Sequence, residues 1–207
     1  MMKVDVILVT YGEPPLPVFS DQWDFSKRIL RKLTRLVAPI PHAVIPLLGA
    51  LRGIKRVRQW KQEGFTSPLE AITQAQADVL SPLLCELFPE HEWSVTPAYE
   101  FRDPTLAQRL DERIQNGTER LVIVPLYVLH SDFTDGITAR DLRTYQAQAK
   151  QPLPPTTLLS FRPHLDTLAE IMAGYIRTQV RALGLTPEAC RETALLCGCH
   201  GTGIHPP

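Results

Sequence analysis

Short runs of almost entirely apolar, β-branched residues recur along this chain, and they constrain its fold more than any other feature. The two clearest are VDVILVT at Val4–Thr10 and LVIVPLYV at Leu121–Val128. A strand that lacks alternating polar residues is typical of a sheet covered on both faces. Helical patterns separate the runs, which favours βαβ units. The sequence therefore predicts an α/β fold, in which helices cover both faces of a parallel sheet.

The remaining elements follow from residue periodicity. We expect three further strands, at Trp93–Ala98, Thr156–Phe161 and Thr193–Gly198. Apolar residues at helical spacing predict five helices, at Ser26–Val37, Ser67–Phe88, Pro104–Gln115, Thr134–Ala149 and Leu165–Leu183. No linker of distinct composition divides the chain, so a single domain is expected.

Composition excludes several classes of protein. The chain has 207 residues, 44% of them apolar, which is enough to bury a core and too hydrophobic for a disordered protein. Its 22 basic and 22 acidic residues balance, which argues against a nucleic-acid-binding protein. Four cysteines are too few for a disulfide framework and favour reduced thiols in the cytoplasm. No apolar run approaches the roughly 20 residues of a membrane span, and the N-terminus, with an early acid at Asp5, is a poor signal peptide.

Charge is distributed unevenly along the chain. Ten basic and three acidic residues lie between Asp21 and Gly64, which gives this segment a net charge of +7. It is either a surface that faces an anion, such as a carboxylate, a phosphate or an acidic membrane, or a solvated helix face. The apolar stretch Ile40–Leu51 interrupts the basic residues and favours an interfacial lip or a ligand cover. Peripheral membrane contact is therefore predicted through residues 40–58.

The residues that follow the strands are the first candidates for a site, because ligands bind beyond the carboxyl ends of parallel strands. These residues are Tyr11 after the first strand, His130 and Ser131 after the third, Arg162 and His164 after the fourth, and Cys199 and His200 after the last. We expect tyrosine, histidine and arginine side chains to converge at this edge of the sheet.

His200 is the most informative of these candidates. It follows a strand and precedes a glycine, so its imidazole is free to reach into a crevice. Imidazole exchanges a proton near neutral pH and binds Fe²⁺ or Zn²⁺. The residue is therefore either a catalytic base and metal ligand or an ordinary hydrogen-bonded surface histidine.

Three other patterns allow more than one interpretation. The cysteines and histidines of Cys197–His205 do not have the spacing of standard zinc sites. The glycines of Gly198–Gly203 depart from the phosphate-binding pattern, and no helix follows them. Ser67, at the start of a predicted helix, is either an N-cap or part of an anion site at the helix N-terminus.

Five short motifs span most of the chain. They are VILVTYGEP at Val6–Pro14, GFTSPL at Gly64–Leu69, PAY with a following Asp-Pro at Pro97–Pro104, LVIVPLYVLHSDFTDG at Leu121–Gly136, and CHG at Cys199–Gly201. In this order and spacing they resemble the N-terminal part of the ferrochelatase family, whose members insert ferrous iron into a porphyrin.

The resemblance implies a flavodoxin-like or Rossmann-like fold, with the tetrapyrrole in a cleft between two α/β halves. It implies that His200 binds the metal and accepts the pyrrole protons, and that Tyr11 lies at the metal face of the ring as a second metal ligand. The implied substrate-binding residues are Tyr11, Trp60, Ser67, His130, Ser131 and Arg162. Porphyrin and Fe²⁺ are then substrates, and no permanently bound cofactor is expected.

The chain also departs from the family pattern. Thr202 and Gly203 follow the His-Gly pair where the family usually has Leu-Pro, and His130 replaces an aromatic residue. The chain ends at Pro207, whereas family members continue into a second half that carries an acidic residue opposite the histidine. Residues 1–192 would then be the N-terminal chelatase-like domain, and 193–207 the strand and His-Gly loop that lead into the second half. The chain is then a truncated ferrochelatase, a fragment of one, or a divergent short protein.

Other functions fit the same residues. A chelatase that loads cobalt or nickel would use the same edge of the sheet, and a non-catalytic porphyrin-binding domain would need no second half. Outside tetrapyrrole chemistry, a nucleotide-binding α/β domain is the main alternative.

Overall fold

The computed structural model of the chain describes residues 1–36, 39–127, 131–132, 134–149, 151–160, 162–186 and 189. Within them, four parallel strands form a sheet in the order β2-β1-β3-β4. The strands are β1 (Met2–Thr10), β2 (His91–Tyr99), β3 (Arg120–Pro125) and β4 (Thr156–Leu158). The predicted parallel α/β fold is confirmed.

Strand β1 forms the centre of the sheet. It pairs with β2 on one side and β3 on the other, so that Val6 lies beside both Val95 and Val122. Every residue from Val4 to Thr10 is buried. This two-sided burial explains why the strand is apolar along its length instead of alternating.

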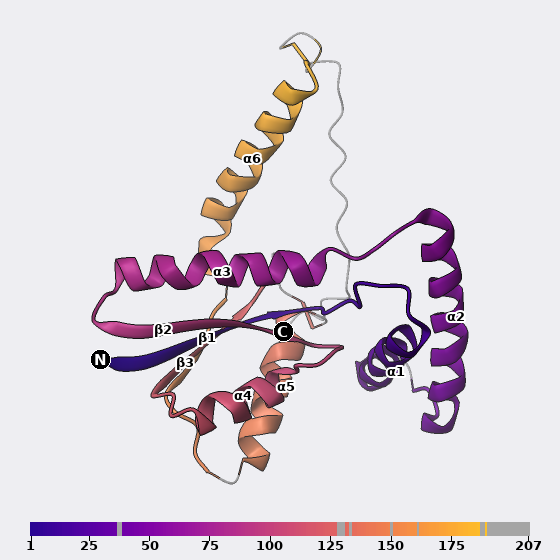
Figure 1. The fold of residues 1–207 in the computed structure, drawn as a ribbon, viewed down its shortest axis with the longest axis horizontal. Helices are drawn as coiled ribbons and strands as arrows, with labels where there is room; N and C mark the ends of the chain where they lie inside the picture. The colour runs from indigo at the N-terminus through magenta and orange to yellow at the C-terminus, as the bar shows by residue number, and fades with distance from the viewer. Residues whose placement is uncertain are drawn as a thin grey trace.

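Helices cover both faces of the sheet, as expected. On one face α3 (Leu69–Leu87) packs against even-numbered residues of β1 such as Val6 and Leu8. On the other face α4 (Leu106–Gln115) and α5 (Asp135–Gln148) pack against odd-numbered residues such as Ile7 and Val9. Figure 1 shows α3 on one side of the strands and α4 and α5 on the other.

Two further helices lie beyond the carboxyl ends of the strands. They are α1 (Phe19–Leu36) and α2 (Ile45–Glu63), which lie side by side (Figure 1). Gly53 of α2 allows the close approach, because a Cβ at this position would lie 3.2 Å from the backbone nitrogen of Trp23. The indole nitrogen of Trp23 donates a hydrogen bond to the Pro46 carbonyl at 3.0 Å. A short 3₁₀ helix (His42–Val44) precedes α2.

The last described helix, α6 (Leu165–Ala182), follows a 3₁₀ turn (Arg162–His164) and extends away from the sheet (Figure 1). None of its described residues is buried. Among the residues that the structure describes, no helix is long and apolar enough to cross a bilayer.

Several predicted boundaries were wrong. The helix expected from Ser26 begins at Phe19, the strand expected to reach Val128 ends at Pro125, and the strand expected to reach Phe161 ends at Leu158. Helix α2 was missed, since Pro46 and two glycines obscure its apolar periodicity; proline is well placed in a first turn. The predicted strand Thr193–Gly198 and the segment 193–207 lie outside the described residues.

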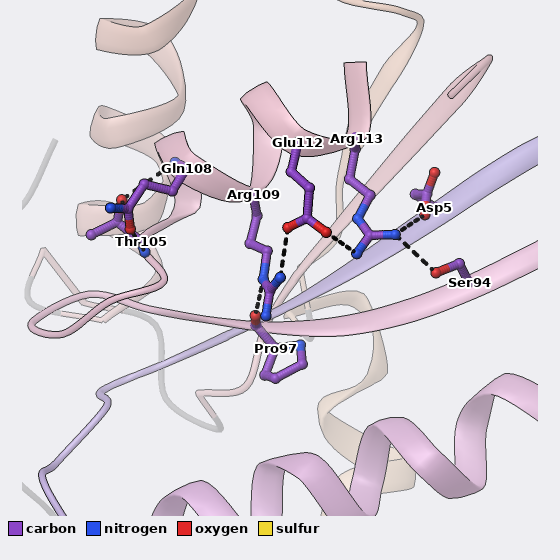
Figure 2. Close-up of polar contacts among 8 residues, drawn as sticks. All are labelled: Asp5, Ser94, Pro97, Thr105, Gln108, Arg109, Glu112 and Arg113. Atoms are coloured by element: carbon purple, nitrogen blue, oxygen red, sulfur yellow. Dashed lines mark hydrogen bonds and ion pairs between the residues drawn. The ribbon is translucent and has the colours of Figure 1, made fainter. Parts of the chain in front are cut away.

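A buried charge lies in the central strand. The side chain of Asp5 is fully buried on β1, and the Arg113 guanidinium reaches it from α4 at 3.3 Å and also donates to Ser94 Oγ at 3.2 Å (Figure 2). The Thr118 hydroxyl donates a further hydrogen bond to Asp5. Arg109 holds the same helix to β2, because its Nε donates to the Pro97 carbonyl at 2.9 Å (Figure 2). These contacts fix α4 against the sheet.

Replacing Arg113 with leucine should lower the free energy of unfolding by roughly 3 kcal/mol, because it leaves a buried carboxylate without its cation. Urea unfolding of the purified chain measures the loss. The double variant Asp5→Asn/Arg113→Leu should recover part of it. A single variant as stable as the wild-type chain would contradict this account.

Candidate functional site

The first candidate residue, Tyr11, lies directly beyond the carboxyl end of β1. Its ring packs edge-to-face against Phe25 of α1 and against Phe101, with centroid distances of 5.6 and 4.7 Å. Burial raises the pKa of the phenol, and the positive charges of Arg52 and Arg56 oppose that rise. The phenol is therefore a neutral hydrogen-bonding group at neutral pH.

Helix α2, which the sequence analysis did not predict, places Arg56 at this edge of the sheet. Arg56 forms an ion pair with Glu13, in the loop after β1, and donates a hydrogen bond to Gln22 Oε1 at 2.9 Å. Its guanidinium also stacks over the rings of Phe25 and Trp60, at 5.4 and 4.7 Å from the centroids. A single arginine thus ties together α1, α2 and the loop after β1.

Trp60 and Ser67 lie around the same loop. Trp60 is buried, in edge-to-face contact with Phe65 at 4.8 Å. The Ser67 backbone nitrogen donates to the Pro15 carbonyl at 3.0 Å. Trp60 therefore contacts Arg56, and the backbone of Ser67 contacts the loop that follows Tyr11.

The side chain of Ser67 does not cap α3. The residue before the helix is Pro68, which makes no side-chain cap hydrogen bond, and Oγ of Ser67 is buried without a partner. The interpretation of Ser67 as an N-cap was therefore wrong. A buried hydroxyl without a partner lowers the stability of the folded chain.

Glu100 is a site residue that the sequence analysis missed. It directly follows β2, and its backbone nitrogen donates to the Thr10 carbonyl at 3.0 Å. Its carboxylate is buried and accepts a hydrogen bond from Thr138 Oγ1 at 3.0 Å. Burial raises the pKa of this carboxyl to about 7, although Lys32 and the Thr138 hydrogen bond favour its ionised form. The rule applied to the other strands, that residues just after a strand are candidates, also identifies Glu100.

A cavity of about 380 Å³ opens beside Glu100. It lies between α1, the start of α4 and α5, and its charged lining residues are Arg28, Arg31, Lys32, Glu100 and Asp141. Lys32 forms an ion pair with Asp141 at 2.7 Å, and Arg28 forms two hydrogen bonds with Asp103. These pairs show that part of the basic segment faces acidic side chains of this chain.

Of the other predicted site residues, the structure describes Ser131 and the backbone of Arg162. Ser131 is buried beside the start of α5, where its Oγ lies 2.9 Å from Thr134 Oγ1 and its carbonyl accepts from the Gly136 nitrogen at 3.1 Å. The backbone of Arg162 lies in the 3₁₀ turn before α6. His130 and His200 lie outside the described residues, as does the Arg162 side chain. Among described residues, no cluster of three or more His, Cys, Asp or Glu could hold a metal ion.

Comparisons with known proteins give one family. A sequence model of the family described as Ferrochelatase matches residues 3–204. A ferrochelatase of Mesorhizobium japonicum is 26% identical over 90% of this chain and 54% of its own length. Another from Brucella anthropi is 26% identical over 96% of this chain and 56% of its own, and one from Desulfotalea psychrophila is 31% identical over 61% and 39%.

The chain belongs to the ferrochelatase family. It spans about half the length of the curated ferrochelatases it matches. The family resemblance found in the sequence motifs is therefore confirmed. The roles that it implies for Tyr11, Trp60, Ser67 and His200 remain predictions.

The buried Glu100 carboxyl should make the stability of this ferrochelatase-family chain depend on pH. Its pKa is about 7 in the folded chain and 4.5 when exposed, so the folded state holds more protons between these values and stability falls as pH rises. The shift corresponds to about 3 kcal/mol. Glu100→Gln should remove this part of the pH dependence, measured by urea unfolding at a series of pH values. If the free energy of unfolding depends on pH in the same way in both chains, this account of Glu100 is refuted.

Proposed function

We propose that this chain binds a dicarboxylic porphyrin beyond the carboxyl ends of β1 and β2, and contributes half of a site that inserts Fe²⁺ into it. Family membership and the group formed by Tyr11, Trp60, Ser67 and Arg56 support the proposal. Fe²⁺ is a substrate here, as is the porphyrin, and the proposal includes neither a resident cofactor nor a nucleic acid.

Metal insertion requires a different contribution from each of these residues. Two pyrrole N–H protons must leave while the metal passes to the ring nitrogens, so a base that titrates near the working pH is required. His200 is that base and a ligand to the entering metal. The neutral Tyr11 phenol hydrogen-bonds at the metal face of the ring, and Arg52 and other cations of the basic segment attract the propionates.

The observation that carries the proposal is the buried Ser67 hydroxyl without a partner. Nearly all buried polar groups in folded proteins are hydrogen-bonded. Because this oxygen has no exposed surface, we propose that a bound ligand opens the loop around it and supplies its missing hydrogen bond. Ser67 stands beside the loop that also carries Glu13 and Pro15, next to Arg56.

Ser67→Ala should therefore weaken binding of metal-free porphyrin about fivefold, because it removes roughly one net hydrogen bond, and should raise the free energy of unfolding by about 1 kcal/mol, because it removes a buried hydroxyl without a partner. Absorbance titration measures the affinity. The matched control is Thr105→Ala: Thr105 makes a true capping box at α4, so this change should cost about 1 kcal/mol of stability and leave porphyrin affinity unchanged.

Metal insertion provides the second part of this test. His200→Ala should abolish insertion of Fe²⁺ or Zn²⁺ while the chain stays folded and still binds porphyrin. Insertion at the wild-type rate would overturn the role of His200, and a wild-type chain that binds no porphyrin would overturn the function. A rate that is highest with Co²⁺ or Ni²⁺ would identify a different chelatase.

A membrane contact is the second part of the proposal. One face of α2 exposes Leu47, Leu51 and Ile54, which are 62%, 57% and 54% exposed and lie at helical spacing. Exposed Lys55 and Arg58 follow them along the helix. An apolar stripe next to basic residues suits the surface of an anionic membrane. We propose that this cytoplasmic chain binds such a surface peripherally through residues 40–58, near the site for its apolar substrate.

The triple variant Leu47→Ser/Leu51→Ser/Ile54→Ser should lose binding to vesicles that contain anionic lipid, measured by flotation. Wild-type binding should weaken as salt is added and be absent with purely zwitterionic vesicles. The control changes three exposed apolar residues of α3, Ile72, Val79 and Leu87, to serine. Equal loss in the control, or retained binding in the α2 variant, would refute the proposal.

A further inference from the structure

The two faces of the sheet are not equally covered. On the face of α4 and α5, residues Leu121 and Ile123 of β3 are buried. On the opposite face, Val122 and Val124 of the same strand are only half-buried, and Thr157, which lies beside Val122 on β4, is exposed. Strand β1 is buried on both faces, so the difference arises beyond it, over β3 and β4. An apolar strand such as β3 is typical of a sheet that is covered on both faces.

Helix α3 borders this half-covered part of the sheet. Its Leu80 and Leu84 are half-buried and pack against the same apolar cluster as the β3 residues. Leu83, one turn on from Leu80, is 44% exposed. We call the combined surface the open face; it consists of Leu80, Leu83, Leu84, Val122, Val124 and Leu126. A contiguous apolar surface of this kind is typical of an interaction site.

Helix α6 carries a matching apolar surface. Five of its side chains recur at the spacing of one helix face: Leu168, Ile171, Met172, Tyr175 and Ile176. None of them is buried, and Ile171 and Tyr175 are 64% and 67% exposed. The helix contacts the 3₁₀ turn before it and extends away from its own sheet (Figure 1). The described part of the chain thus holds both an uncovered apolar helix and an uncovered apolar sheet face.

Charge indicates how the two surfaces fit together. Helix α3 has no basic residue, and its exposed Asp78 and Glu86 lie at and beyond its midpoint. The C-terminal half of α6 carries exposed Arg177 and Arg181 and no acidic residue. The two helices are also nearly equal in length, with 19 and 18 residues. When α6 lies beside α3 and runs in the same direction, its two arginines lie beside the two acidic residues.

We propose that α6 of one copy packs on the open face of a second copy, beside α3 of that copy, and that the second copy returns the contact. A second copy fits better than the same chain, because α6 points away from its own sheet (Figure 1). Each copy supplies one helix and one open face, so the two contacts form around a two-fold axis and the assembly closes as a dimer. The inference is independent of the proposed function, since it uses no residue of the candidate site.

The contact has both a driving force and a preferred direction. The apolar side chains of α6 and of the open face leave water together, which favours association. Ion pairs at the exposed margin add little affinity, but they favour the orientation in which opposite charges meet. Every contact occurs twice in the dimer, so a substitution that weakens one contact weakens both.

The first test is the mass of the chain in solution, measured by light scattering during size-exclusion chromatography over a range of concentrations. The wild-type chain should have twice the mass of one chain and dissociate on dilution. The variant Ile171→Ser/Met172→Ser/Tyr175→Ser should have the mass of one chain throughout, because it removes the apolar face of α6. The triple serine variant of α2 is the matched control and should stay dimeric. A wild-type monomer, or an α6 variant that is still a dimer, overturns the proposal.

The second test exchanges the charges. The variants Arg177→Glu/Arg181→Glu and Asp78→Lys/Glu86→Lys should each dimerise about tenfold more weakly or worse, because like charges then meet in both contacts. All four positions are exposed, and circular dichroism checks that each variant is folded. A mixture of the two variants should form a dimer with one chain of each kind. In that dimer one contact regains opposite charges in exchanged positions, and the other keeps the wild-type charges.

Native mass spectrometry of the mixture distinguishes the possible occupants of the open face. If α6 covers the open face of its own chain, the wild-type chain and every variant are monomers. If α6 pairs with α6 of the second copy, the α3 charge variant alone dimerises like the wild-type chain. Either result overturns the proposal, as does a mixture that dimerises no better than its two components. Recovery of the dimer in the mixture supports it.

Discussion

The burial of β1 on both faces is the constraint on which the rest of the structure depends. Seven consecutive buried residues, Val4 to Thr10, fix the strand at the centre of the sheet, with α3 on one side and α4 and α5 on the other. Because the neighbouring strands are parallel to β1, their carboxyl ends meet at one edge. Tyr11, Glu100 and Tyr127 each follow a strand of this central group, so their proximity is a consequence of topology.

The strongest predictions from sequence concerned elements whose local pattern and tertiary role agree. The apolar run at Val4–Thr10 lies in a buried strand, Leu121–Pro125 lies in β3, and the helix at Leu165 ends within a residue of its expected boundary. Helix α2 shows the opposite case. Its buried positions include two glycines, so its packing against α1 depends on close backbone approach and not on a stripe of large apolar side chains. Hydrophobic periodicity does not detect such an interface.

The candidate site could be predicted only in part, for related reasons. Tyr11 follows directly from the rule that residues after parallel strands gather at one edge. Arg56 was hidden because its partners Glu13 and Gln22 are far away in sequence. Ser67 has the residue type and position of a helix cap, and only the position of its hydroxyl shows that it is not one. Local sequence gives a side chain's chemistry, but its partners depend on long-range contacts.

In the described part of the chain, some buried polar groups have partners and others do not. At Asp5, in the middle of the sheet, Arg113 and Thr118 satisfy the buried carboxylate, so the group serves the fold. At the carboxyl edge, Ser67 Oγ, Glu100 Oε2 and the Tyr127 hydroxyl are buried without full hydrogen bonds. Each lowers the stability of the folded chain. They lie on loops or directly after strands, where a different residue could remove the cost without disturbing the sheet. His91 Nδ1 at the amino end of β2 and Arg113 Nε on α4 are also buried without partners, so a buried group without a partner indicates a ligand site only where it also lies at the edge where parallel sheets bind ligands.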